Sequence, residues 1–351
     1  WYGGEPLLRP RVIESLSARL LQICQRRGMR YDASIVTNGY ALDEPMARTL
    51  HALSVRTVQV TLDGAEHDHD RRRALRSGRP TFRRIVENLR AAAHAVPLRF
   101  NVRINIDRRN AGDIEQLMAE LAAAGLSGRP DFRIYFAPVE AITEGCHGVA
   151  DDCMGKAEYG RLEAHLYRRA IELGLAAMPQ PPRFHGTCAA VRPGGLVIVP
   201  TGAVHKCWDT VNQPEHAIGN VFDLEALSKS PALLRWLRWS PFDHPACRDC
   251  RLLPVCAGAC AYKFLHAEDT LGEAAELPCP SWKYNIKERL LLRAEKMGAI
   301  DPADIDRSLP GVFTDPAELC IEGAPVAPIA PRRARRTRLP IIQSPSLEDR
   351  P

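Results

Sequence analysis

The sequence predicts an α/β fold with a parallel sheet in its N-terminal half. Short apolar runs alternate there with longer stretches in which apolar residues recur at helical spacing. Helices of this length between strands indicate βαβ units, whose right-handed crossovers wind a parallel sheet into a barrel or an open doubly wound sheet. From about residue 180, shorter elements punctuated by proline, glycine and cysteine indicate a second domain organised by metal.

The elements of the first half follow in order along the chain. Runs of β-forming residues predict strands over 33–37, 57–62, 98–106 and 132–137. Amphipathic spacing predicts helices over 11–27, 43–53, 81–95 and 111–124, and Asp43 is positioned to cap the second of them. In the second half, 195–199 followed by Pro200-Thr201-Gly202 predicts a hairpin, and 281–296 predicts a helix.

Length and composition limit the classes of function. A chain of 351 residues suggests about two domains, and 25% charged with 45% hydrophobic residues is ordinary for a globular protein. The apolar runs fall far short of the ~20 residues that span a bilayer, and a net charge of +5 is too small to favour a polyanion. We therefore expect neither a membrane nor a nucleic acid as a partner.

The chain divides into three predicted parts. Residues 1–175 form the α/β domain, 176–300 form the cysteine-rich domain, and 301–351 form a Pro/Arg-rich tail whose composition predicts disorder. The arginine-rich run at 332–338 is interpreted as a solvated basic patch, with contact to an acidic partner or nucleic acid as the alternative.

Cysteine is the most unusual part of the composition. An odd total of 11 fits a disulfide framework poorly, and a chain of this size favours thiolates that hold metal in a reducing, cytoplasmic compartment. Thiolates select zinc, copper(I) or iron–sulfur clusters. Two iron–sulfur clusters, one of them with an incomplete ligand set, account for seven clustered cysteines better than one zinc ribbon with spare cysteines. The seven are Cys188, Cys207, Cys247, Cys250, Cys256, Cys260 and Cys279.

The spacing of these cysteines, C-x13-G-x4-C, then C-x2-C-x5-C-x3-C and a final C, resembles the SPASM domain. That domain extends many radical S-adenosylmethionine (SAM) enzymes and holds two auxiliary [4Fe–4S] clusters. The resemblance assigns Cys188, Cys207 and Cys260 to the first cluster, and Cys247, Cys250, Cys256 and Cys279 to the second. The first cluster then has an open iron, or takes a ligand from Cys146 or Cys153, which are more simply interpreted as loop cysteines.

The N-terminal half carries a separate resemblance to the radical SAM superfamily. Gly3-Gly4-Glu5-Pro6 is similar to the GGEP motif that binds the SAM amino group, in which glycines permit close approach and a carboxylate pairs with an ammonium. Thr37-Asn38-Gly39 and Thr61-Leu62-Asp63-Gly64 follow at successive strand ends, where α/β folds bind ligands. The SAM-binding residues that this resemblance implies are Gly3, Gly4, Glu5, Asn38, Thr61, Arg73 and Arg103.

Other polar residues near these strand ends have two interpretations. Arg103 and Asn105 either contact SAM or substrate, or are structural. His69 is interpreted as a surface histidine satisfied by Asp70, with a role in the chemistry as the alternative.

The resemblance implies a partial (βα)6 radical SAM barrel that lacks its first strand, followed by a SPASM domain. In the superfamily, a CxxxCxxC loop upstream of GGEP holds the SAM-cleaving cluster. That motif does not occur here, and Cys24 stands alone. We expect the sequence, which starts at Trp1, to be a fragment that begins after this loop, with a protein that has lost radical initiation as the alternative.

The implied activity is modification of a peptide or protein side chain through hydrogen abstraction by a 5′-deoxyadenosyl radical, with an electron donor such as flavodoxin or ferredoxin. The layout is similar to that of anaerobic sulfatase maturases, although Trp208 occupies the position of their candidate catalytic aspartate. Asp209 is therefore the candidate general base, and a turn cap is the alternative. The competing class is a non-catalytic iron–sulfur or zinc protein that binds a peptide or relays electrons.

Overall fold

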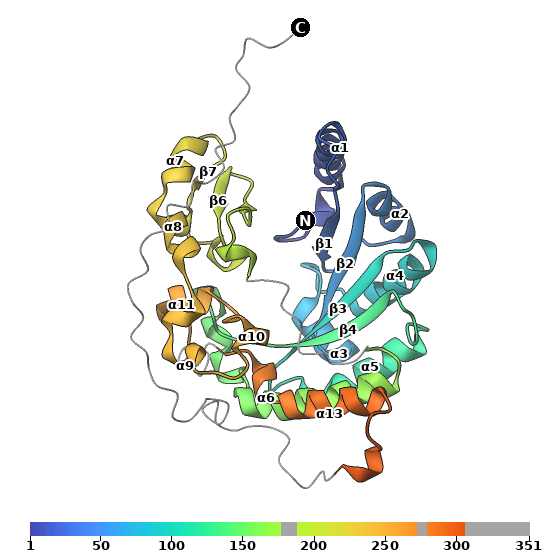
Figure 1. Cartoon of the computed structure of the whole chain (residues 1–351). Coiled ribbons are helices and arrows are strands. Elements are labelled where there is room, and N and C mark those ends of the chain that lie inside the picture. The colour runs from blue at the N-terminus through green and yellow to red at the C-terminus, as the bar shows by residue number, and fades with distance from the viewer. Residues whose placement is uncertain (177–187, 272–278, 306–351) are drawn as a thin grey trace. The chain divides into compact units, whose positions relative to one another are not determined.

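The computed structural model describes residues 1–176, 188–271 and 279–305 (Figure 1). The tail for which disorder is predicted, 301–351, lies outside the described residues from 306 onward. Its described part, 301–305, includes the short 3-10 helix η10 (Pro302–Asp304). Within the described ranges, none of the helices combines the length and apolar character needed to cross a membrane.

A four-stranded parallel sheet organises the N-terminal half. Its strands pair in chain order, so their carboxyl ends lie along one edge. Alternate residues of each strand are buried on one face, whereas the other face carries half-exposed, mostly polar side chains. The strands are β1 (Ala33–Thr37), β2 (Val55–Leu62), β3 (Arg99–Ile106) and β4 (Phe132–Pro138). All four predicted strands are confirmed to within two residues at each end, as is the α/β class.

Helices cover the apolar face of this sheet and share one hydrophobic core with it (Figure 1). Asp43 caps the second helix by accepting a hydrogen bond from the Met46 amide at 2.9 Å, as predicted. The first helix forms over the expected residues, but only Ile13 and Ser17 are buried on it. These helices are α1 (Pro10–Arg26), α2 (Glu44–Ala52), α4 (Phe82–Ala95), α5 (Ile114–Ala123) and α6 (Lys156–Glu172).

Two helices of this half were not predicted. α3 (Glu66–Arg73) follows the carboxyl end of β2, and its eight residues are all polar. α6 joins the α/β half to the later helix α13 (Ile286–Lys296) through Arg289, which forms a buried ion pair with Glu163 at 2.7 Å. The predicted helix at 281–296 is interrupted at Tyr284–Asn285, between the short η9 (Ser281–Lys283) and α13.

The cysteine-rich half is built from short elements. The predicted hairpin is confirmed: β5 (Val197–Ile198) and β6 (Ala203–His205) pair antiparallel, and β7 (Gly219–Asn220) joins them. A second, smaller core includes Val204, Trp236 and Tyr262. The surrounding helices are α7 (Leu224–Lys229), α8 (Pro231–Arg238), α9 (Pro245–Arg248), α10 (Leu253–Cys256) and α11 (Tyr262–Leu265).

Candidate functional site

The segment before β1 is held against the end of that strand by Glu5. One carboxylate oxygen, Oε1, accepts hydrogen bonds from the Thr37 hydroxyl at 2.7 Å and the Leu7 amide at 3.0 Å. The other, Oε2, accepts from the Asn38 amide at 2.6 Å. A carboxylate offers about four acceptor positions, so Glu5 retains one for a further donor while it fixes the loop.

Gly3 and Gly4 precede this carboxylate in the left-handed region, with φ of 97° and 48°. A side chain at either position would meet no atom within 4 Å, so the space beside this backbone is open. The two glycines therefore present their peptide groups to a space that a ligand could enter.

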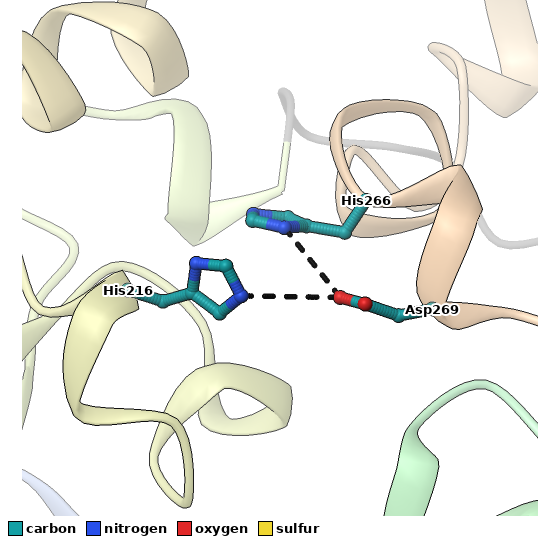
Figure 2. Close-up of side chains that lie close together, drawn as sticks. All are labelled: His216, His266 and Asp269. Atoms are coloured by element: carbon teal, nitrogen blue, oxygen red, sulfur yellow. Dashed lines mark ion pairs between the residues drawn. The ribbon is translucent and has the colours of Figure 1, made fainter.

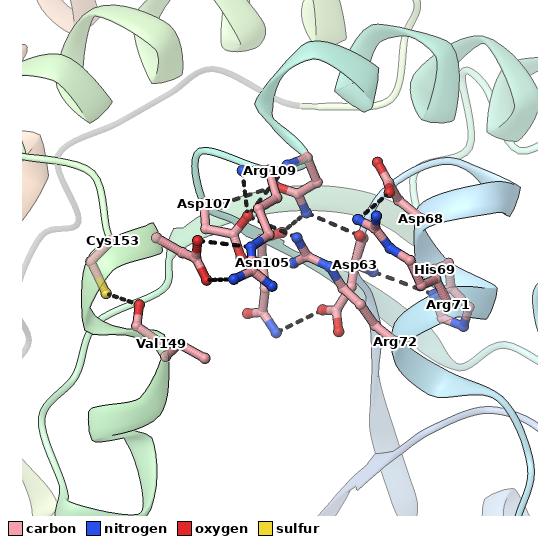
Figure 3. A network of polar contacts seen from close by, with 12 residues as sticks. Asp63, Asp68, His69, Arg71, Arg72, Asn105, Asp107, Arg109, Val149 and Cys153 are labelled. Carbon is pink, nitrogen blue, oxygen red and sulfur yellow. Dashed lines mark hydrogen bonds and ion pairs between the residues drawn. The ribbon is translucent and has the colours of Figure 1, made fainter.

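Asp63, directly after β2, is the centre of a polar network (Figure 3). Its carboxylate accepts from Arg73 Nε at 2.5 Å and from Asn105 Nδ2 at 3.0 Å. Asn105 in turn accepts from Arg103 Nε at 2.8 Å. These hydrogen bonds form a continuous chain from Arg73 through Asp63 and Asn105 to Arg103. The chain links α3, the end of β2 and β3.

Arg103 lies in the middle of a row of polar side chains across the half-exposed face of the sheet. The strand register places Thr61 on one side of it and Tyr135 on the other. The Tyr135 hydroxyl donates to Gln59 Oε1 at 2.9 Å, and burial raises the pKa of Tyr135. Arg103 therefore lies on the half-exposed face of the sheet, between Thr61 and Tyr135.

A second ion pair stabilises the end of β3. Arg72 binds both oxygens of Asp107 at 2.8 Å, and the backbone amides of Arg109 and Asn110 donate to the same carboxylate. Burial acts to raise the pKa of Asp107, but these hydrogen bonds outweigh it and hold the pKa below its usual value. The fully buried Asn110 donates to the backbone carbonyls of Asp63 and Asn105, so both strand ends are fixed together.

The interpretation of His69 as a surface residue paired with Asp70 is wrong. His69 is buried, its Nδ1 accepts from the Asp63 amide at 3.3 Å, and its Nε2 lies 3.2 Å from the Thr81 hydroxyl. The Thr81 hydroxyl donates to the Arg73 carbonyl, so it accepts from Nε2 and the ring is the neutral Nε2–H tautomer. Burial, with help from Arg73, lowers the pKa of His69 to about 4. Asp70 instead accepts from the amides of Thr81 and Phe82 at the start of α4.

The predicted metal-binding cysteines fall into two groups. Burial, together with the nearby thiols of Cys247, Cys250 and Cys279, raises the pKa of Cys256 to about 11. Cys188, Cys207 and Cys260 pack against the second core, and burial raises the pKa of Cys207. None of the seven forms a disulfide. The Lys283 ammonium lies 3.7 Å from the Cys279 sulfur.

Cys146 and Cys153, which were considered as extra cluster ligands, form hydrogen bonds within their own loop. Both lie in or next to η3 (Glu144–Asp152). Cys146 accepts a hydrogen bond from Thr143 at 3.4 Å, and Cys153 donates to the Val149 carbonyl at 3.3 Å (Figure 3).

Asp209 lies in η5 (Trp208–Thr210), directly after Cys207. Its Oδ2 accepts from the Cys207 thiol at 3.5 Å. Burial raises the pKa of Asp209, against the opposing charges of Lys263 and Arg103. The Trp208 ring lies 5.8 Å from that of Tyr2, so η5 neighbours the glycine segment at the start of the chain.

Comparison with known proteins identifies the first part of the chain. Residues 1–121 match the model of the Radical SAM superfamily. This part of the chain is similar to a radical SAM domain. It includes β1–β3, the glycine segment and the Asp63 network.

Curated relatives match the same region. A GTP 3′,8-cyclase of Nostoc punctiforme is 36% identical over 103 residues, which are 28% of this chain and 29% of the cyclase. An Fe-coproporphyrin III synthase of Methanosarcina barkeri is 32% identical over 112 residues, which are 32% of this chain and 25% of the synthase. The chain thus matches less than a third of the length of either relative.

Solved structures share the fold over a longer stretch. "Native anSMEcpe with bound AdoMet" aligns with a TM-score of 0.59 over 85% of this chain and 83% of that one, at 17% identity. "Native anSMEcpe with bound AdoMet and Cp18Cys peptide" aligns equally well, with a TM-score of 0.59, 17% identity, and 85% of this chain and 84% of that one covered. At this identity the likeness shows the fold alone.

The residues of the matched region fit SAM. The ligand carries an ammonium, a carboxylate and ribose hydroxyls, and the strand ends offer a carboxylate at Glu5, a guanidinium at Arg103 and a hydroxyl at Thr61. Arg73 is less available, because its guanidinium already binds Asp63 at 2.5 Å. The open space beside Gly3 and Gly4 lies next to the carboxylate of Glu5.

The sequence did not single out Asp63, Asn110 or Tyr135 as individual residues of this site. Asp63 could have been found from the sequence, because it directly follows the predicted strand that ends at Leu62, where α/β folds bind ligands. Asn110 lies five residues beyond Asn105 in a turn, and Tyr135 alternates within an apolar strand. Only the assembled sheet brings these side chains together.

Proposed function

We propose that this protein is a radical SAM enzyme that modifies a side chain of a peptide or protein. The polar network at the carboxyl ends of β1–β3, inside a domain that matches the superfamily, is the observation that carries the proposal. SAM held beside a reduced iron–sulfur cluster supplies hydrogen-atom abstraction. The residues of this chain bind and orient that ligand.

Each predicted SAM-binding residue has a distinct task. Gly3 and Gly4 leave room for close backbone approach, and Glu5 accepts from the ammonium with its remaining acceptor position. Asn38 keeps Glu5 oriented through its amide. Thr61 and Arg103 lie side by side across the strands and bind the ribose and the carboxylate. Arg73 is a positioning residue, because it orients Asp63 and, through Asn105, Arg103.

The seven clustered cysteines are proposed to hold two auxiliary [4Fe–4S] clusters, in the groups Cys188/Cys207/Cys260 and Cys247/Cys250/Cys256/Cys279. A single zinc ion bound at 2.3 Å would bring its sulfurs to about 3.8 Å from one another. Among the residues that the structure describes, no three thiol sulfurs lie within 4.8 Å of one another. Seven clustered cysteines also exceed the four ligands of one zinc ion, and this count supports two clusters.

The proposed substrate is a peptide or protein, and the proposed general base is Asp209. Support comes from its position, since η5 borders the glycine segment and Asp209 interacts with Arg103. A peptide is bound in one of the structures that share the fold. A cytoplasmic location and an electron donor such as flavodoxin or ferredoxin complete the proposal.

SAM binding tests the proposed site. We expect Arg103→Ala to weaken SAM binding at least tenfold, about 1.4 kcal/mol, when the anaerobic holoprotein from the complete gene is studied by equilibrium dialysis. Arg99→Ala is the matched control, because Arg99 lies at the other end of β3 on the same face and is exposed. Equal affinity of the Arg103 and Arg99 variants would exclude the site.

Metal analysis tests the clusters separately. The anaerobically purified protein is expected to contain iron and acid-labile sulfide in equal amounts, and Cys250→Ser is expected to lower iron by about four per chain. Cys24→Ser, on α1, is the control and is expected to retain all the iron. Zinc without labile sulfide would instead support a zinc protein.

A further inference from the structure

Two histidines and an aspartate converge outside the sites described so far (Figure 2). His216 ends η6 (Pro214–His216), whereas His266 and Asp269 flank and end η8 (Ala267–Asp269). Asp269 Oδ2 lies 3.7 Å from His266 Nδ1 and 3.9 Å from His216 Nε2. The three potential ligand atoms all lie within 4.8 Å of one another.

His266 supplies an independent sign of a missing ligand. Its side chain is almost fully buried, with the residue 2% exposed, yet its Nδ1 has no hydrogen-bond partner. An unsatisfied buried polar atom costs free energy comparable to a lost hydrogen bond. This nitrogen points toward Asp269 and His216 (Figure 2), where a bound cation would satisfy it.

Neighbouring residues hold the side chains of Asp269 and His266 in place, as residues around bound metal ions commonly hold the ligands. The Tyr262 hydroxyl donates to Asp269 Oδ2 at 3.1 Å, and the Tyr262 ring stacks on His266 with centroids 4.9 Å apart. Hydrogen bonds to ligating carboxylates and packing against ligating rings fix both for binding. His147 Nε2 lies 2.9 Å from the Asp269 carbonyl and ties η3 to the same turn.

We propose that His216, His266 and Asp269 bind one Zn²⁺ ion. Imidazole nitrogen and carboxylate oxygen suit zinc, and three protein ligands leave the fourth position to water. Ligands held at 2.0–2.2 Å in a tetrahedron lie about 3.4 Å apart, so the two separations from Asp269, 3.7 and 3.9 Å, need to close by only about half an ångström or less. The site contains no sulfur, which separates it chemically from the cysteine groups.

Zinc at this position joins two segments of the chain, and a hydrogen bond from His147 ties a third to them. η6 follows the small antiparallel sheet, η8 follows α11, and His147 belongs to η3 beyond the parallel sheet. α11 begins two residues after Cys260. The ion therefore crosslinks segments next to the first cysteine group and does not depend on the cysteines for its ligands.

Zinc content and coordination test this proposal in the anaerobic, cluster-loaded protein. After one equivalent of Zn²⁺ is added and excess is removed, elemental analysis is expected to find one zinc per chain in the wild type and in His94→Gln, whose side chain is exposed on α4. His216→Gln and Asp269→Asn are expected to lose that zinc while iron and the far-ultraviolet circular dichroism stay unchanged.

X-ray absorption at the zinc edge of the wild type decides the ligands even if a variant fails to fold. The proposal predicts nitrogen and oxygen ligands at about 2.0–2.1 Å and no sulfur at about 2.3 Å. A sulfur shell would place the zinc on the cysteines and overturn the proposal. Equal zinc retention in wild type and Asp269→Asn would overturn it as well.

Discussion

His69 should make the protein less stable as the pH falls below neutrality. Burial, assisted by Arg73, lowers the pKa of His69 from 6.5 to about 4 in the folded state. The folded protein therefore binds fewer protons than the unfolded chain between these values, so the stabilisation is complete above pH 6.5 and is lost as the pH falls toward 4. The full shift corresponds to about 3 kcal/mol, of which about 2 kcal/mol is lost between pH 7 and pH 5.

Urea unfolding at pH 7 and pH 5, followed by tryptophan fluorescence, measures this loss. His69→Gln removes the titrating ring, so the free energy of unfolding of this variant should fall by about 2 kcal/mol less than that of the wild type over the same interval. Other titrating groups and the clusters are common to both proteins, and their pH dependence cancels in the comparison. His94→Gln should behave as the wild type. If wild type and His69→Gln lose equal stability, the buried neutral histidine is refuted.

Three further substitutions test the strand ends. Gly64 has a φ of 120°, and a Cβ added there would lie 3.1 Å from the Cβ of Asp68. Gly64→Ala should therefore lower the free energy of unfolding by about 1–3 kcal/mol. Unchanged stability in urea would show that the backbone at this position is not strained by a side chain. Arg72→Lys replaces the two hydrogen bonds to Asp107 by one and should lower the free energy of unfolding by about 1–2 kcal/mol in the same assay. A variant as stable as the wild type would show that the second hydrogen bond does not contribute to stability. Glu5→Gln should weaken SAM binding about tenfold in equilibrium dialysis, and wild-type affinity would argue against the proposed role of the carboxylate.

The parallel sheet was predictable because its strands carry their own signals. β2 and β3 alternate apolar and polar residues, and each run is bounded by a turn or a helix cap. α3 was not predictable in the same way: its eight residues lack an apolar face, and the helix forms where Asp68 and His69 are buried against the strand ends. Periodicity cannot detect a helix that is held by polar contacts.

The location of the candidate site was predictable, but the hydrogen bonds between its side chains were not. Glu5, Asn38 and Thr61 come from motifs, and their positions near strand ends follow from the order of elements. Arg103 was predicted only from its place on the next strand, with a structural role as the alternative. The pairing of Arg73 with Asp63 and the burial of His69 depend on how α3 folds back, which no local pattern encodes. The group formed by His216, His266 and Asp269 has no motif spacing, since its members come from two separate segments.

Reductive cleavage of SAM tests the central claim most directly. The protein expressed from its complete gene, purified anaerobically and treated with dithionite and SAM, should form 5′-deoxyadenosine, and Arg103→Ala should form much less than Arg99→Ala at limiting SAM. Absence of 5′-deoxyadenosine from the iron-loaded wild type would contradict a radical SAM enzyme and leave a non-catalytic iron–sulfur protein.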